Sequence, residues 1–184
     1  MNPNLSAIQA LPTWDNFNEN FPRDSDPLYD SPEKMYKSIG AAVATFYVDE
    51  STNTCAIRLS KALNYSGVII PNIPNQTYKG ADNKYYFKAA FEINIWMRNT
   101  FGTNPANLST PRNLNHYCYT QKQAGVKGVN LPGLLSGKKG IYSIYSSKFS
   151  WASGHGDLLN PDGTCGNNCH FEAPISRLDV WILN

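Results

Sequence analysis

Cys55 combines two features that a nucleophilic thiol requires. It stands at the predicted start of a helix, directly after Asn53 and Thr54, either of which suits the N-terminal cap. The free N–H groups and partial positive charge of a helix N-terminus stabilise a thiolate and bind an oxyanion. The alternative is that Cys55 is a small core residue on an apolar helix face. Arg58, one turn later, either assists the thiolate or is a solvated helix charge.

A cysteine nucleophile needs a base, and His155 is the best candidate among the three histidines. Gly154 and Gly156 flank it and allow another segment to approach the backbone closely at a strand start. A third polar group must fix the tautomer of the imidazole. The residues near enough in sequence to do so are Asn167, Asn168, Asp157 and Asp162. His116 and His170 adjoin aromatic residues, and we expect them at packing or surface positions.

Cys165 and Cys169 flank three turn-forming residues in CGNNC, a spacing that sterically allows a local disulfide. Such a bond implies exposure to an oxidising compartment. The alternatives are two reduced thiols in a loop, or zinc bound by this pair with His170 or His155. Cys118 lies in HYCY, where we expect it to be buried and inert.

Helices precede strands along the chain. The first 30 residues are rich in Asn, Asp and Pro, which predicts a loosely structured lead-in that packs through its aromatic residues. Caps and apolar periodicity predict helices over residues 31–47, 54–67 and 87–101, with a loop over 67–83. Short aromatic or β-branched runs predict strands over 140–147, 149–159, 169–171 and 178–183, with a turn at 160–163. This order predicts one α+β domain over residues 1–184, with helices packed on an antiparallel sheet.

Composition excludes several classes of protein. The 16 Lys and Arg residues nearly balance the 14 Asp and Glu residues, so the chain lacks the basic surface that nucleic-acid binding needs. No run approaches the ~20 apolar residues of a membrane-spanning helix. The N-terminal residues lack the pattern of a signal peptide, so we expect either a cytoplasmic location or export that needs no such signal.

Two stretches of the chain resemble the fourth amidase effector family of type VI secretion systems. Residues 53–64 (NTCAIRLSKALN), followed by Gly67, resemble the nucleophile helix of that family. Residues 153–158 (SGHGDL), followed by Cys165 and Cys169, resemble its histidine strand and cysteine-flanked turn. The first stretch is the more specific, because its cysteine, arginine and Leu-Ser pair recur together in the family.

The resemblance implies an NlpC/P60, papain-like fold and a cysteine amidase that needs no metal or cofactor. It implies cleavage of the γ-D-glutamyl–meso-diaminopimelate bond of peptidoglycan stem peptides by a D,L-endopeptidase. The expected toxin is secreted by the type VI machinery without a signal peptide and acts in the periplasm of the target bacterium. A cognate immunity protein is expected to occlude the active site, and neither nucleic acid nor membrane is an expected partner.

Carried onto this sequence, the resemblance makes Cys55 the nucleophile, His155 the base and Asn167 the residue that orients the imidazole. The chain departs from the family in three places. Asn167 replaces the usual aspartate, Leu159 stands where the family tends to have tryptophan, and the turn over 160–164 is one residue longer. The longer turn leaves open whether Asn167 or Asn168 takes the third position.

Two other functions remain as alternatives. A muramidase-type glycosidase would use a pair of carboxylates, for which the sequence offers Glu92, Asp157 and Asp162. A non-catalytic module would bind the cell wall or a protein through its tyrosines and asparagines, and it would be insensitive to thiol alkylation.

Overall fold

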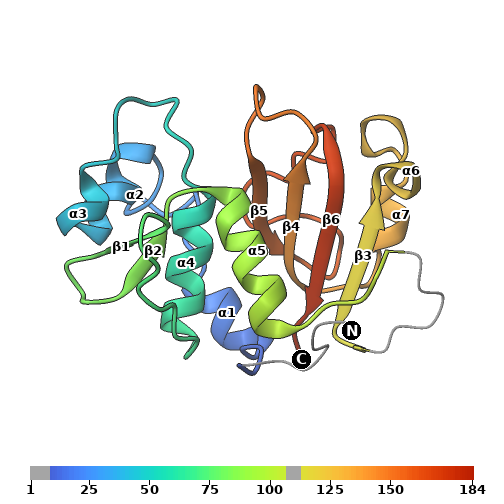
Figure 1. The fold of residues 1–184 in the computed structure, drawn as a ribbon, viewed down its shortest axis with the longest axis horizontal. Helices are drawn as coiled ribbons and strands as arrows, with labels where there is room; N and C mark the ends of the chain where they lie inside the picture. The colour runs from blue at the N-terminus through green and yellow to red at the C-terminus, as the bar shows by residue number, and fades with distance from the viewer. Residues whose placement is uncertain (1–8, 107–112) are drawn as a thin grey trace.

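Helices come first along the chain and the main sheet last, as the change from blue and green to orange and red in Figure 1 shows. The computed structural model describes residues 9–106 and 113–184. The larger described helices are α1 (Trp14–Asn20), α2 (Pro32–Ile39), α4 (Cys55–Tyr65) and α5 (Ala90–Phe101). Shorter helical segments are α3 (Ala41–Ala44), α6 (Gln121–Ala124), η1 (Val126–Gly128) and α7 (Leu131–Leu135). None of the described helices has the length and apolar character needed to cross a membrane.

The described strands form two antiparallel sheets. A small sheet pairs β1 (Thr77–Lys79) with β2 (Tyr85–Phe87). The main sheet has the order β3-β6-β4-β5 and consists of β3 (His116–Thr120), β6 (Ile175–Ile182), β4 (Gly140–Ser146) and β5 (Gly154–Leu159). Helices packed on an antiparallel sheet confirm the predicted α+β class.

Most residues of α4 are buried, as expected of a helix that belongs to the core. Asn53 caps its first turn, because its Oδ1 accepts the N–H of Cys55 at 2.9 Å. Farther along the helix, the Ser60 hydroxyl donates to the carbonyl of Ala56 (2.7 Å) and accepts the N–H of Phe87 in β2 (3.0 Å). These bonds fix both the start of α4 and the small sheet that lies against it.

Two glycines allow close packing around β5: Gly156 against α4 and Gly154 against β4. A Cβ atom at Gly156 would clash with the side chain of Leu59, and one at Gly154 would clash with the carbonyl oxygen of Ile144. The close approach predicted around His155 is therefore confirmed. A cluster of buried apolar residues from α1, α4, α5 and the sheet completes this contact and includes Phe17, Phe21, Leu59, Leu63, Ile93, Met97, Leu158 and Trp181.

Asp179 of β6 is fully buried and ties α5 to the sheet. Its carboxylate accepts hydrogen bonds from His116 (3.0 Å) and Arg177 (2.9 Å), and from Asn94 and Arg98 of α5. Burial alone would raise the pKa of Asp179, but the His116 hydrogen bond and the two arginine charges lower it to about 2. The carboxylate is therefore ionised at neutral pH, and its negative charge is compensated by the two arginines and by the hydrogen bonds from His116 and Asn94.

The N-terminal helices differ from the sequence prediction in their boundaries. The helix predicted over residues 31–47 ends at Ile39, because Gly40 takes a left-handed φ of +71°, and α3 follows it. The lead-in contains α1, whose Phe17 is fully buried. Residues 1–8 of the predicted lead-in lie outside the described part of the chain. The predicted loop over 67–83 contains β1, which is short and pairs only with β2.

The strands were predicted less completely than the helices. The strand β3 was not expected, because its sequence HYCYT adjoins a Pro- and Asn-rich connection. The strand expected over 149–159 begins only at Gly154, and residues 169–171 form a turn rather than a strand. The turn at 160–163 is confirmed, since the N–H of Gly163 donates to the carbonyl of Asn160 at 3.0 Å.

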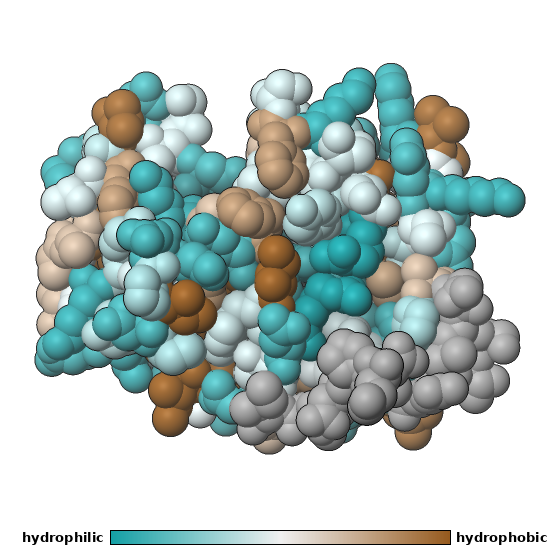
Figure 2. Space-filling model, in the orientation of Figure 1, coloured by the Kyte–Doolittle hydropathy of each residue, from teal (hydrophilic) through white to brown (hydrophobic). Residues whose placement is uncertain are grey.

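Hydrophilic residues dominate the face shown in Figure 2, and apolar residues appear over α5 and the β4–β5 connection. There the ring of Phe91 packs on that of Phe149, with centroids 5.9 Å apart. Ile95 of α5 is 44% exposed. The buried side of α5 instead carries Ile93 and Met97.

Replacing Asp179 by Asn removes the charge that compensates two partly buried arginines. We expect the free energy of unfolding to fall by about 3–5 kcal/mol, measured by urea denaturation. The matched control is Glu19→Gln on the exposed side of α1, which should stay within ~0.5 kcal/mol of the wild type. An Asp179→Asn variant as stable as the control would contradict the role assigned to this network.

Candidate active site

A cavity of about 230 Å³ lies where the start of α4 meets β5 and the turn that follows it. The helix side supplies residues 51–55 and Arg58, and the sheet side supplies residues 155–157. The turn contributes Asn167, Asn168 and His170, and the lead-in contributes Asp24. The structure thus brings all three predicted site residues, Cys55, His155 and Asn167, to the wall of one cavity.

Cys55 is buried at the base of this cavity, with 6% of its surface exposed. Burial raises the pKa of its thiol to about 11, although the N–H groups of Gly156, Ala56 and Cys55 itself act in the opposite direction. At neutral pH the sulfur therefore carries its proton. The site needs a neighbouring base to produce the thiolate at the moment of attack.

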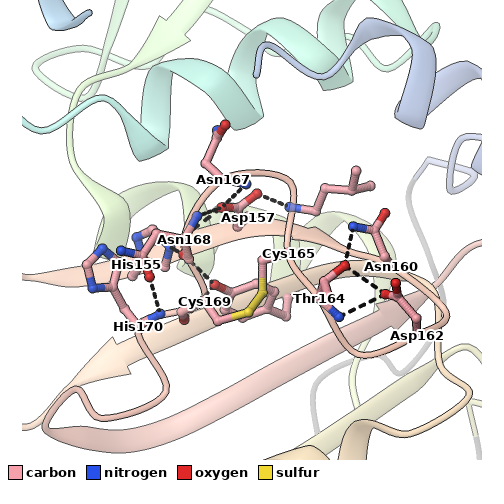
Figure 3. Close-up of a disulfide and its surroundings, with 12 residues drawn as sticks. His155, Asp157, Asn160, Asp162, Thr164, Cys165, Asn167, Asn168, Cys169 and His170 are labelled. Carbon is pink, nitrogen blue, oxygen red and sulfur yellow. Dashed lines mark hydrogen bonds and ion pairs between the residues drawn. A yellow bond between two sulfur atoms is a disulfide. The ribbon is translucent and has the colours of Figure 1, made fainter. Parts of the chain in front are cut away.

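His155 supplies an imidazole that can act as this base. Its Nε2 lies 2.7 Å from the main-chain carbonyl oxygen of Asn168 (Figure 3). A carbonyl can only accept, so Nε2 carries the hydrogen, and Nδ1 of the neutral ring is left as the acceptor. Burial and the neighbouring His170 lower the pKa of His155 to about 4. The ring is therefore neutral at pH 7.

Asn167 lies at the cavity, but its side chain is directed to the lead-in. Its Oδ1 accepts the N–H of Asp24 at 2.7 Å, and its Nδ2 donates to the carbonyl of Pro22 at 3.1 Å. In this structure the group on Nε2 of His155 is the Asn168 carbonyl, rather than the Asn167 amide that the sequence predicted. The neighbouring Asn168 was the alternative left open by the longer turn.

Asp157 determines the path of the turn that carries this carbonyl. Its buried carboxylate accepts three main-chain N–H groups, from Leu158 (2.6 Å), Asn167 (3.1 Å) and Asn168 (3.1 Å), as Figure 3 shows. One of its oxygens also lies 3.9 Å from Nε2 of His155. Burial raises the pKa of Asp157 to about 7, against these hydrogen bonds.

The predicted disulfide between Cys165 and Cys169 is present, with a Cα–Cα distance of 5.3 Å. It closes the turn immediately before His170 (Figure 3). Because the two sulfur atoms are bonded to each other, neither cysteine is available as a ligand for the zinc site considered from the sequence. Asp162 precedes the disulfide in the chain and does not line the cavity. Its carboxylate accepts hydrogen bonds from the N–H and the hydroxyl of Thr164 at 3.0 and 2.7 Å.

Arg58 is buried, so it is not the solvated helix charge considered for it. Its guanidinium donates to Thr54 Oγ1 (2.9 Å) and to the carbonyls of Pro22 (2.9 Å) and Tyr29 (2.8 Å). It also pairs with the Asp24 carboxylate at 2.5 Å. These contacts fix the lead-in against α4, so that Asp24 forms part of the cavity wall.

Sequence reasoning missed Asp24 and His170 as cavity residues. Asp24 reaches the site only through tertiary contacts, and no local pattern marks it. His170 was expected to be a packing or surface residue, and its position directly after the paired cysteines was the available signal. Of the three acids considered for a glycosidase, only Asp157 lines the cavity.

Comparisons with known proteins agree on one family. The model of the family "Type VI secretion system (T6SS), amidase effector protein 4", Tae4, matches residues 51–181. Tae4 of Salmonella typhimurium, solved with the immunity protein Tai4 of Enterobacter cloacae, is 24% identical over 94% of this chain and 99% of that chain, with a TM-score of 0.68. Tae4 of Enterobacter cloacae is 22% identical over 97% of this chain and 99% of that chain, with a TM-score of 0.69. No curated protein matches the chain.

The structural likeness confirms the predicted papain-like α+β fold. The family match covers well over half of the chain and includes the start of α4, the strand β5 and the disulfide turn. The chain belongs to the Tae4 family of type VI secretion system amidase effectors.

Proposed function

We propose that this amidase effector is a cysteine D,L-endopeptidase that cleaves the γ-D-glutamyl–meso-diaminopimelate bond of peptidoglycan stem peptides. The observation that carries the proposal is the joint placement of Cys55, at a helix N-terminus, and a neutral His155 on one cavity wall. Membership of the amidase effector family supports the same chemistry. The bond itself is taken from the family resemblance.

In the proposed reaction, Nδ1 of His155 accepts the thiol proton of Cys55 as the sulfur attacks the amide carbonyl carbon. The tetrahedral intermediate collapses when the imidazolium gives this proton to the leaving amine, which breaks the C–N bond and leaves a thioester. Water attacks the thioester and passes a proton to His155; the C–S bond then breaks, the cleaved peptide leaves as a carboxylic acid, and the imidazolium returns its proton to the Cys55 sulfur. The Asn168 carbonyl holds the ring in the required tautomer throughout.

The oxyanion of the intermediate needs N–H donors at the start of α4. The main-chain N–H of Cys55 is the nearest in sequence, and in this structure it donates to Asn53 Oδ1 at 2.9 Å. Substrate binding therefore has to turn the Asn53 side chain away before this N–H can serve the oxyanion. Residues 51–54, which precede the helix, already line the cavity.

The proposed setting is the periplasm of a target bacterium, reached through the type VI machinery. The disulfide between Cys165 and Cys169 suits such an oxidising compartment. Relatives have been solved as complexes with the immunity protein Tai4. We expect a cognate immunity protein to cover the cavity of this chain, whose residues 1–184 act as one catalytic domain.

Replacing Cys55 by Ala removes the nucleophile, and we expect hydrolysis of diaminopimelate-type peptidoglycan to fall by ~10³-fold or more. Mass-detected chromatography should show fragments broken between D-Glu and diaminopimelate with the wild type only. The matched control is Cys118→Ala, since Cys118 is the other free thiol among the described residues and lies outside the cavity. Full activity in Cys55→Ala would refute cysteine catalysis, and new reducing sugar ends would indicate a glycosidase.

The burial of Cys55 also predicts how its reactivity depends on pH. In a Cys118→Ala background, we expect the rate of alkylation by iodoacetamide to rise ~10-fold per pH unit from pH 7 to pH 10, because the thiolate forms with a pKa of about 11. Peptide mass spectrometry measures the alkylated fraction. A rate that is already constant across neutral pH would instead show a thiolate–imidazolium pair in the resting site.

A further inference from the structure

A second histidine is held beside the proposed base by the same turn. His170 adopts a left-handed φ of +49°, directly after the disulfide-bonded Cys169. Its N–H donates to Asn168 Oδ1 (3.2 Å), and its carbonyl accepts the N–H of Ala173 (3.0 Å). Asn168 thus contacts both histidines, with its carbonyl on His155 and its side chain on His170. One short segment sets the relative position of the two rings.

The two imidazole rings are in direct contact. Their centroids are 4.6 Å apart, with an angle of 77° between the planes, and both residues line the cavity. His170 is half-buried, and its Nδ1 lies 3.3 Å from the carboxylate of Glu172. The indole of Trp151 is the other described ring near it, at 6.0 Å. His170 therefore lies between the proposed base and a surface carboxylate.

We propose that His170 is a positioning residue for the reaction: its ring, which Asn168 holds in contact with that of His155, fixes the orientation of the proposed base. This role rests on the proposed function of His155 as the base. It requires no contact between His170 and the substrate.

The groups around His155 predict the direction in which each neighbour shifts its pKa. The titratable and charged groups that line the cavity or contact the His155 ring are Cys55 and Arg58 of α4, Tyr142 of β4, Asp157 of β5, Asp24 of the lead-in, and His170 and Glu172 of the turn. After burial, a positive charge on His170 is the largest influence that lowers the pKa of His155, and Glu172 raises it. His170 and Glu172 therefore shift the pKa of His155 in opposite directions.

This balance matters in both halves of the reaction. His155 must accept a proton from Cys55 and then give it up to the leaving amine. A positive neighbour makes the imidazolium a stronger acid, which favours the second transfer and disfavours the first. Glu172 limits this effect, so the two side chains adjust one catalytic group without touching the scissile bond.

The direct test is NMR titration of ¹³C-labelled histidine in a Cys55→Ala background, with the His155 signal assigned from a His155→Gln variant. His170→Gln keeps a polar side chain but removes the imidazole that lowers the pKa of His155, and we expect the His155 midpoint to move to higher pH by ~0.5 unit or more. Glu172→Gln should move it to lower pH. Trp151→Phe, which keeps an aromatic ring against His170, should leave it unchanged.

The pH profile of kcat/KM, measured with Cys55 intact, should follow these shifts. The acid limb is expected at higher pH in His170→Gln and at lower pH in Glu172→Gln. An unchanged His155 midpoint in His170→Gln, or shifts of the same sign in both variants, would overturn the proposal. Wild-type activity in His155→Gln would instead refute the proposed base, whatever the titration shows.

Discussion

The geometry of the site depends on how closely the start of α4 approaches β5. The helix can come this close to the strand only because residue 156 is a glycine: a Cβ atom there would occupy the space of the Leu59 side chain. The apolar residues around this contact are fully buried, so the approach is stabilised by core packing rather than by the polar residues of the site. A helix N-terminus that carries a thiol is thereby held beside a strand that carries an imidazole. A shift of even 1 Å between the two would slow the proposed reaction strongly.

Two buried side chains, Asp157 and Arg58, fix the remaining walls of the cavity, and each is hydrogen-bonded to the backbone. Asp157 accepts three N–H groups and so holds the disulfide turn against β5. Arg58 donates to two carbonyls of the lead-in and pairs with Asp24, which holds that segment against α4. Asn167 joins the two walls, because its amide bridges the turn and the lead-in. Removing either side chain would leave its hydrogen-bond partners unpaired in a buried setting. This would lower the free energy of unfolding by more than the loss of one contact does.

Local patterns predicted the parts of the site that depend on local chemistry. The cap before Cys55, the glycines around His155 and the spacing of Cys165 and Cys169 each act over a few residues, and all three features are present. The orienting group was harder to predict, because the Asn168 main-chain carbonyl has no side-chain signature and depends on how Asp157 folds the turn. Arg58 and Asp24 lie 34 residues apart in sequence, and only the tertiary fold brings them together.

The central claim is that Cys55 forms a covalent bond to the substrate during amide hydrolysis. The most direct measurement is rapid acid quenching of the reaction with a disulfide-intact protein and a soluble stem peptide, followed by peptide mapping by mass spectrometry. The account predicts a thioester on the peptide that contains Cys55, which forms before the free acid product is released and disappears as the substrate is consumed. Product formation at the full rate with no acyl group on Cys55 at any time would contradict it.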